Sequence, residues 1–525
     1  MTDNKSRRRQ TTPVRIGVTA VGGDNPIRIQ SMTNTATLDT VASVAQCLRI
    51  ADAGADIVRL TAQGVSQARN LGEIRRRLRE AGCDIPLVAD IHFNPAAAFA
   101  AAEEVEKVRI NPGNFVDPGR TFRQLSYTDE QYAAELGRLR DKFVPFLNLC
   151  KEKSTAIRIG VNHGSLSDRI MSRYGDTPAG MVESAMEFLR ICVAEDFSDV
   201  VISIKASNVV IMTQTVRLLV EAMDREGMAF PLHLGVTEAG DAEDGRVKSA
   251  VGIGSLLADG IGDTIRVSLS EAPENEIPVA RSLVAHIDDI MSDDAPRAAR
   301  VCRDTAGLKA PLAAGVDFAF GDVPGGFVEL KSSARNRIDD IRRRYADVLG
   351  GNPDAKVLVT LVYPDVTDRE TLTVAASVDL GSLLLDGLAD AIAIEAPAFS
   401  PEAIKSLELS ILQATRRRIT KTEYIACPGC GRTLFDLPSV LQTVKRGTSH
   451  LKGLKIGVMG CIVNGPGEMA DADYGYVGAA AGCISLYKGK ECVVKNIPAD
   501  EALPRLIELI KQNGDWVDES QENAC

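Results

Sequence analysis

The segment IPLVADIHFNPAAAFAAAEEVEKVRINPGN, residues 85–114, decides the fold. It holds two short apolar runs, Pro86–Ile91 and Lys107–Asn111, on either side of an alanine-rich stretch. Short runs of this kind predict buried strands, and alanine-rich stretches between them predict helices. The segment is therefore expected to form a strand, a helix and a second strand.

The same alternation extends over residues 27–270, where segments such as Thr40–Ala55 and Met181–Ala194 have apolar residues at helical spacing. The further strand candidates are Ile27–Ser31, Asp56–Leu60, Ala156–Asn162, Asp199–Lys205, Pro231–Thr237 and Thr264–Ser268. Eight strands, each followed by a helix, predict an α/β fold with an N-terminal (β/α)8 TIM barrel. The stretch Val14–Asp24 is expected to be a hairpin that closes the barrel bottom, because residues 22–25, Gly-Gly-Asp-Asn, have turn chemistry.

Two further regions follow the barrel. The first is expected to be an inserted α/β domain, with strands at Gly315–Phe320, Lys356–Val362 and Ala389–Ile394. The second is smaller, carries a close cysteine pair and ends in a predicted helix at Ala502–Gln512. The predicted domains are residues 1–292, 293–405 and 406–525.

Composition and charge narrow the class of protein. The chain has 525 residues, 45% hydrophobic and 25% charged, which is ordinary for soluble globular proteins and long enough for two or three domains. Its net charge of −11 argues against a nucleic-acid partner. No apolar run approaches the roughly 20 residues of a membrane helix, and the polar start Met1–Thr12 lacks the apolar segment of a signal peptide. A cytoplasmic location without a membrane partner is expected.

Five predicted strands carry a cation where an apolar residue is expected: Arg59, Arg109, Arg158, Lys205 and Arg266. Buried cations need partners, and the same strands supply only Asp90 and Glu238. The imbalance predicts a small polyanionic ligand, and a diphosphate fits because arginine pairs with phosphate through two parallel hydrogen bonds. For any single arginine, an ion pair within the barrel is an equally good interpretation. Neutral contacts to the ligand are expected from His92, Asn111, Asn162, His233 and Ser268.

The C-terminal region, residues 406–525, contains Cys427 and Cys430 in a C-x-x-C pair. Cys461 follows in a Gly-Pro-Gly loop that ends at Glu468. The spacing alone leaves three interpretations open. Three thiolates with a weaker fourth ligand favour an iron–sulfur cluster. A fourth thiolate from Cys483 or Cys492 would give a structural zinc site, and a pair without metal would be a redox dithiol.

Eight segments of the chain carry a resemblance to a known family. They are Gln30–Thr35, Leu87–Phe93, Arg109–Asn114, Arg158–Asn162, Lys205–Ser207, His233–Gly240, Gly260–Arg266 and Cys461–Glu468. In these segments the chain resembles the 4-hydroxy-3-methylbut-2-enyl diphosphate synthases of the methylerythritol phosphate pathway. The segments lie within residues 13–272 and 406–490, and the last is the most specific.

The resemblance implies an oxidoreductase of isoprenoid biosynthesis with a C-terminal α+β domain similar to sulfite-reductase modules. That domain would hold a [4Fe–4S] cluster on Cys427, Cys430, Cys461 and Glu468, without Cys483 or Cys492. The substrate would be 2-C-methyl-D-erythritol 2,4-cyclodiphosphate, opened by two-electron reduction with loss of water. A flavodoxin or ferredoxin would supply the electrons, Glu238 would donate a proton, and Glu468 would be a displaceable ligand.

The chain departs from the shorter bacterial members at Arg120–Lys153 and at the insert of residues 293–405. Both features resemble the three-domain form of plants and some bacteria. A homodimer with a shared active site is possible, but the insert could also let the cluster domain fold back on its own barrel. The insert is interpreted as a spacer, with a docking surface for the electron donor as the alternative.

Two other functions compete with this interpretation. The first is a Schiff-base aldolase or lyase that uses Lys205, with a structural zinc domain attached. The second is a diphosphate sensor without turnover, whose cluster reports the redox state.

Overall fold

The computed structural model describes residues 8–117, 126–293, 298, 300, 326–352, 355–462, 465–469 and 471–518, without the side chains of residues 349 and 468. The chain forms two compact units. The first contains residues 1–240, 262–278 and 421–525, and the second contains residues 241–261 and 279–420. The predicted domain bounds of 1–292, 293–405 and 406–525 divide the chain differently and stay a prediction.

The chain begins with the expected hairpin, formed by β1 (Val14–Ile16) and β2 (Thr19–Val21). Its apolar side chains pack against Ile57, Val88, Ala156 and Val201, which lie at or near the amino ends of barrel strands. The predicted turn was misplaced, because the hairpin reverses at Gly17, whose φ is +58°. The Gly-Gly-Asp-Asn sequence forms a separate turn, in which the Asn25 N–H donates to the Gly22 carbonyl at 3.2 Å.

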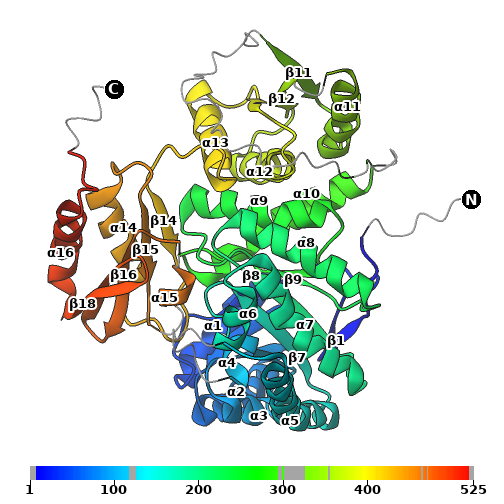
Figure 1. The fold of residues 1–525 in the computed structure, drawn as a ribbon, viewed down its shortest axis with the longest axis vertical. Helices are drawn as coiled ribbons and strands as arrows, with labels where there is room; N and C mark the ends of the chain where they lie inside the picture. The colour runs from blue at the N-terminus through cyan, green and yellow to red at the C-terminus, as the bar shows by residue number, and fades with distance from the viewer. Residues whose placement is uncertain are drawn as a thin grey trace, which may run out of the picture. The chain divides into compact units, whose positions relative to one another are not determined.

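The barrel contains eight parallel strands, as predicted (Figure 1). They are β3 (Arg28–Met32), β4 (Ile57–Ala62), β5 (Leu87–Ile91), β6 (Lys107–Ile110), β7 (Ala156–Asn162), β8 (Val200–Lys205), β9 (His233–Leu234) and β10 (Thr264–Ile265). Their order is β8-β7-β6-β5-β4-β3-β10-β9, and a bridge from Ile202 to Leu232 brings β8 and β9 together. The strands β9 and β10 are shorter than predicted, and Gly235 after β9 leaves room for Lys205, whose Nζ would lie 2.8 Å from a Cβ there.

Helices connect successive strands of the barrel. They are α1 (Thr40–Asp52), α2 (Val65–Glu80), α3 (Pro95–Ala102), α4 (Pro112–Phe115), α5 (Asp129–Lys153), α6 (Asp168–Tyr174), α7 (Pro178–Ala194) and α8 (Val209–Arg225). Several begin at a capping side chain; the Asn94 carboxamide, for example, accepts from the Ala97 N–H at the start of α3. No helix in the described part of the chain is long and apolar enough to cross a membrane.

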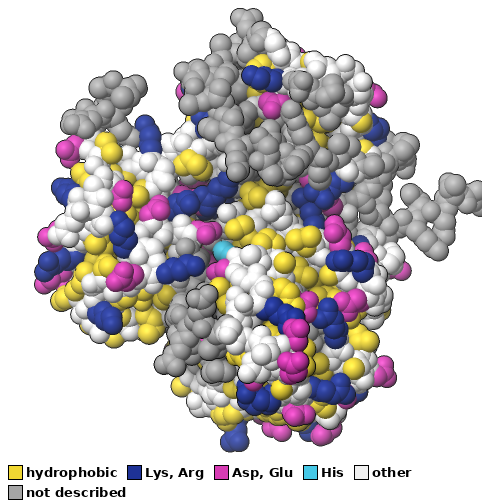
Figure 2. Space-filling view, in the orientation of Figure 1, with side chains coloured by type: hydrophobic (Ala, Val, Ile, Leu, Met, Phe, Trp, Pro, Cys, Tyr) yellow, Lys and Arg dark blue, Asp and Glu magenta, His cyan; other side chains and the backbone are white. Residues whose placement is uncertain are grey.

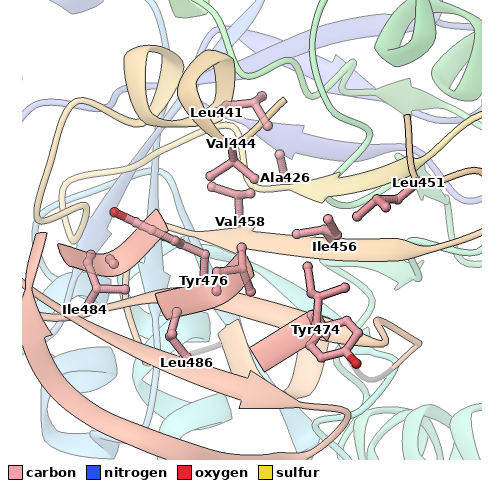
Figure 3. Packing of buried hydrophobic residues seen from close by; sticks show 13 residues of the cluster. Ala426, Leu441, Val444, Leu451, Ile456, Val458, Tyr474, Tyr476, Ile484 and Leu486 are labelled. Carbon is pink, nitrogen blue, oxygen red and sulfur yellow. The ribbon is translucent and has the colours of Figure 1, made fainter. Parts of the chain in front are cut away.

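The C-terminal part of the first unit is a five-stranded sheet. Its strands, in spatial order, are β14 (Glu423–Ala426), β15 (Lys455–Met459), β16 (Tyr474–Ala480), β17 (Cys483–Lys488) and β18 (Glu491–Pro498), and its helices are α14 (Leu437–Thr448), α15 (Gly465–Glu468) and α16 (Ala499–Gln512). Leu441 and Val444 of α14 pack with Ala426 and Val458 of the sheet (Figure 3). The predicted last helix is confirmed as α16.

The second unit is built on a parallel sheet of β11 (Phe327–Ser332), β12 (Lys356–Val362) and β13 (Ala391–Glu395). Its helices are α9 (Ala242–Ala258), α11 (Arg337–Gly351), α12 (Arg369–Leu385), α13 (Pro401–Ala414) and most of α10 (Glu276–Met291). The predicted strand at Lys356–Val362 is confirmed. The one at Ala389–Ile394 begins two residues later and ends one residue later than predicted. The one at Gly315–Phe320 lies outside the described residues. The sequence interpretation missed β11.

The helices α9 and α12 approach closely through glycines. A Cβ on Gly381 would lie 2.9 Å from Val251, and one on Gly254 would overlap Val378. The segment between β9 and β10 is therefore packed as part of the second unit, although it lies within the barrel sequence.

Candidate active site at the carboxyl ends of the barrel strands

One cavity of the first unit is lined by residues from the barrel and from the C-terminal sheet domain. The barrel supplies Met32, Arg59, Asp90, His92, Arg109, Arg158, Asn162, Lys205, Thr237, Glu238, Arg266 and Ser268. The sheet domain supplies Cys427–Cys430, Arg432, Thr433, Met459–Cys461 and Gly465. The empty space is about 760 Å³, counting its opening to solvent. Both sets belong to the same chain, so the cavity forms within a single chain.

The strands bring the five predicted cations together as buried side chains. Register places Arg109 opposite Arg158, and Asn162 opposite Lys205. Glycines leave room for the long side chains, because a Cβ on Gly160 would lie 2.6 Å from Arg109 Nε. On the face shown in Figure 2, by contrast, Lys and Arg side chains are interspersed with Asp and Glu.

Asp90 is the centre of this group and is 2% exposed. Its carboxylate accepts from Arg109 Nη1 at 3.2 Å and from Arg432 Nη2 at 3.4 Å. Arg59 and Arg158 lie slightly farther away, at 4.0 and 3.9 Å. Burial alone would raise the pKa of Asp90, but Arg59 and Arg109 hold it well below its usual range. One carboxylate is thus shared among four cations.

Positive charge exceeds negative charge among the described residues of the cavity lining. Arg266 is paired outside the cavity lining with Glu276, at 2.9 and 3.2 Å. Among the described residues that line the cavity, six are cations, and the carboxylates are Asp90 and Glu238. Burial, and then the neighbouring Arg59, lowers the pKa of Lys205 well below its usual range. This excess would be relieved by an anionic ligand.

Several cations lack a good acceptor. The Arg59 guanidinium lies against the Met32 thioether sulfur, with N–S distances of 2.9 and 3.1 Å, and thioether sulfur is a weak acceptor. Arg158 Nε and Nη1 have no hydrogen-bond partner among the described residues. Lys205 has no ion pair within the described ranges. These groups are available to a ligand.

The predicted neutral contacts divide into two sets. His92, Asn162 and Ser268 line the cavity. Burial, and then Arg432, lowers the pKa of His92 to about 3, so its ring is neutral and its Nε2 accepts from Arg109 at 2.6 Å. Asn111 lies apart from the cavity lining, because its carboxamide caps α4 by accepting from the Gly113 N–H at 3.0 Å. His233 also lies apart, fully buried beside Thr264.

The three predicted cysteine ligands lie together in the cavity lining. The Gly460 N–H donates to Cys427 Sγ at 3.3 Å. Burial, and then Glu238, raises the pKa of the Cys427 thiol. Burial would lower the pKa of Arg432, but Cys430 and Asp90 raise it. Three thiols with an amide and a guanidinium beside them fit an anionic iron–sulfur group held by thiolates.

The other candidate ligands are Glu468, Cys483 and Cys492. The side chain of Glu468, at the end of α15, lies outside the described residues. Cys483 and Cys492 lie on β17 and β18, apart from the cavity lining. Among the side chains that the structure describes, no group of three or more His, Cys, Asp or Glu is spaced to hold a metal ion.

Close contacts hold the cysteine loops, which are the segments around Cys427–Cys430 and Cys461–Gly467, against the barrel. The Ser270 hydroxyl donates to the Cys427 carbonyl at 2.9 Å, and Ala239 forms a parallel bridge with Ala426. A Cβ on Gly164 would overlap the carbonyl oxygen of Gly467. The backbones of residues 164 and 467 therefore approach more closely than any residue with a Cβ at position 164 would allow.

Glu238 lies where the two halves of the cavity meet. Its side chain is buried, and it accepts from the Thr237 hydroxyl. Its φ of +50° is in the left-handed region, which is uncommon for a residue with a side chain. Such backbone strain is concentrated at functional sites. The carboxyl group is near enough to Cys427 to act on the pKa of that thiol.

The sequence interpretation missed Arg432, Thr433, Thr237, Met32 and Glu276. A signal was present for Arg432, because it is a cation two residues after Cys430. Glu276 could not be assigned, because its pairing with Arg266 depends on the start of α10.

Comparisons with known proteins match the barrel sequence and the C-terminal sheet domain. The family model described as the GcpE TIM-barrel domain matches residues 11–281, and the one described as the GcpE protein C-terminal domain matches residues 423–512. Two curated relatives are named 4-hydroxy-3-methylbut-2-en-1-yl diphosphate synthase (flavodoxin). The protein of Phocaeicola vulgatus is 52% identical over 97% of this chain and 99% of its own length. That of Parabacteroides distasonis has the same identity and the same coverage of both chains.

Among solved structures, the N-acetylneuraminic acid synthetase of Leptospira borgpetersenii aligns with a TM-score of 0.36 at 12% identity. That alignment covers 55% of this chain and 94% of the synthetase chain.

Proposed function

Because the chain belongs to the GcpE family of 4-hydroxy-3-methylbut-2-en-1-yl diphosphate synthases, we propose that its cavity is the active site for that reaction. The chain is an oxidoreductase of isoprenoid biosynthesis. The proposed reaction is the two-electron reductive opening of 2-C-methyl-D-erythritol 2,4-cyclodiphosphate, with loss of water. The observation that supports it best is the excess of buried cations that faces three thiols in one cavity.

The cations would bind the diphosphate. Arg59, Arg158 and Lys205 are the strongest candidates, because none of them has a hydrogen bond to a carboxylate among the described residues. Asp90 lies 4.0 Å from Arg59 and 3.9 Å from Arg158. Arg109 is held by Asp90 and by Asn162 Oδ1, the latter at 3.0 Å, so it is oriented before the ligand arrives. Arg266 and Ser268 would complete the contacts, with His92 and Asn162. Buried, oriented cations stabilise negative charge that develops as the ring opens.

Glu238 would donate the proton to the departing hydroxyl. Its position between the cations and Cys427 suits this role, because the leaving oxygen must lie between the diphosphate and the source of electrons. The Thr237 hydroxyl donates to Glu238 and so fixes the carboxyl orientation. Asn111 and His233 would support the strands and α4 rather than contact the substrate.

Cys427, Cys430 and Cys461, with Glu468 as the fourth ligand, would hold a [4Fe–4S] cluster. When bound, the cluster supplies the two electrons one at a time. The Gly460 N–H and the Arg432 guanidinium would stabilise negative charge on the thiolates. The zinc and dithiol interpretations have no support from the relatives.

A flavodoxin is the proposed electron donor, since the curated relatives carry that word in their names. Ferredoxin remains the alternative. A monomeric active site is proposed, because one chain supplies both halves of the cavity; the possible homodimer, the cytoplasmic location and the spacer role of the insert stay predictions.

Anaerobic turnover tests the proposal directly. Purified, iron-replete protein is given the cyclodiphosphate and a strong one-electron reductant, and the linear hydroxylated diphosphate is measured. Its appearance supports the proposal. Tight binding without product would favour the sensor function instead. The Schiff-base alternative requires substrate trapped on Lys205 by borohydride, and that adduct would contradict the proposed role of this lysine.

A further inference from the structure

A second polar layer lies inside the barrel, below the cavity. It consists of Gln30, Lys107, Arg158 and His233, which are at most 1% exposed. Alternate residues of a strand face the same side, so Gln30 lies one layer toward the amino end from the cavity residue Met32. Lys107 is related to Arg109 in the same way. Gln30, Lys107 and His233 are absent from the cavity lining, which only Arg158 reaches.

The hydrogen-bond donors of this layer exceed its acceptors. Lys107 Nζ makes one long contact, 3.5 Å to Gln30 Oε1. Within the described ranges, no partner is found for Gln30 Nε2, Arg158 Nε, Arg158 Nη1 or His233 Nε2. The Thr264 hydroxyl lies 3.4 Å from His233 Nδ1, and if it donates there, Nε2 carries the proton and is another donor.

The layer also contains uncompensated charge. Lys107 has no ion pair among the described residues, and the nearest carboxylate to Arg158 is Asp90, 3.9 Å away and shared with other cations. Burial, and then Arg158, lowers the pKa of Lys107 well below its usual range. Buried water could accept from the donors, but it would not balance the charge of Arg158 or keep Lys107 protonated. An anion would accept hydrogen bonds from these donors and would also balance the positive charge.

We propose that Gln30, Lys107, Arg158 and His233 bind one small monovalent inorganic anion, a halide such as chloride, in the interior of the barrel. The interior of an eight-stranded barrel is largely filled by its own side chains, so the proposal is limited to a monatomic ion, which needs less space than a phosphate. This site shares Arg158 with the cavity, whereas Gln30, Lys107 and His233 are absent from the cavity lining. The inference does not depend on the proposed reaction, because it needs neither the cyclodiphosphate nor reducing equivalents.

Bromide provides the direct test. Crystals of the iron-replete protein are grown with sodium gluconate and inorganic pyrophosphate, which occupies the upper cavity, and are then soaked in sodium bromide. Anomalous scattering recorded at the bromine edge should show a peak beside Lys107 Nζ and Arg158 Nη1. Water density there without an anomalous peak overturns the proposal.

A second measurement uses solution stability. With pyrophosphate saturating, the unfolding equilibrium constant of the full chain should fall about tenfold for each tenfold rise in bromide above its Kd. Lys107→Met removes the charge while keeping similar volume, and this dependence should disappear. Lys248→Met, which removes another buried lysine, should retain it. Equal bromide dependence in the wild type and Lys107→Met contradicts the site.

Discussion

Replacement of Gly164 by alanine should separate the barrel from the cysteine loops without unfolding either. The new methyl group would lie 2.7 Å from the carbonyl carbon of Gly467, whereas carbon atoms in contact are about 3.5–4.0 Å apart. The two backbones must therefore part by about 1 Å. Overpacking of this kind costs about 1–3 kcal/mol. The fraction of molecules in which the cysteine loops lie against the barrel therefore falls roughly 5- to 150-fold.

Gly82→Ala is the matched control. Gly82 has a φ of +76° and Gly164 a φ of +80°, so an alanine is strained at both positions by about 1–2 kcal/mol. A Cβ on Gly82, however, meets nothing within 4 Å. The difference between the two variants isolates the contact with Gly467.

The assay is kcat/KM for the cyclodiphosphate, with the iron content and cluster absorbance measured on the same samples. Gly164→Ala should lose activity about 5- to 150-fold more than Gly82→Ala, at equal iron content. Equal kcat/KM in the two variants would refute the argument that this glycine contact closes the active site.

Three further predictions concern single side chains. Glu238→Gln should reduce kcat by about 10²- to 10⁴-fold with an unchanged cluster spectrum, and full activity would remove Glu238 from the mechanism. Arg432→Met should shift the cluster midpoint potential negative by on the order of tens of millivolts, because a nearby cation stabilises the more negative reduced form; an unchanged potential at full iron content would contradict this. Burial raises the pKa of Glu408 to about 7, so this group stabilises the fold fully below its unfolded-state pKa and loses that contribution as the pH rises toward 7. Glu408→Gln keeps an acceptor for the Ile394 N–H. Above pH 7 the variant should exchange that amide more slowly than the wild type, with a free energy of opening up to about 3 kcal/mol higher, and near pH 4 the two proteins should exchange it equally. Equal exchange in the two proteins at both pH values would show that the charge of Glu408 has no effect.

The barrel and its cations could be predicted from the sequence for a simple reason. A cation such as Arg109 or Arg158 in the middle of a β-branched run has no solvent-facing alternative when both faces of a strand are buried. The pairing of Arg266 with Glu276 could not be predicted from the sequence, because it depends on how α10 begins. Asn111 was read as a substrate contact, although an asparagine before Pro-Gly is also typical of a helix N-cap.

The hairpin and the cysteine loops show a second limit. Residues 22–25 have better turn chemistry than Gly17, but the pairing of Val14 with Val21 places the reversal at Gly17. Arg432 reaches Asp90 only because its loop lies against the barrel, and that contact leaves no periodic signal in the sequence.

The packing of α9 has a consequence for anyone who redesigns this chain. Residues 293–405 look like a cassette that could be excised or exchanged between relatives, but α9 is interlocked with α12 through Gly254, Val378, Gly381 and Val251. Arg342 of the cassette is likewise ion-paired to Asp259, just after α9, at 3.0 Å. Excision would leave an apolar helix face and a buried aspartate without their partners. A functional transplant must therefore carry residues 241–261 along with the cassette, so the exchangeable piece is discontinuous in the gene.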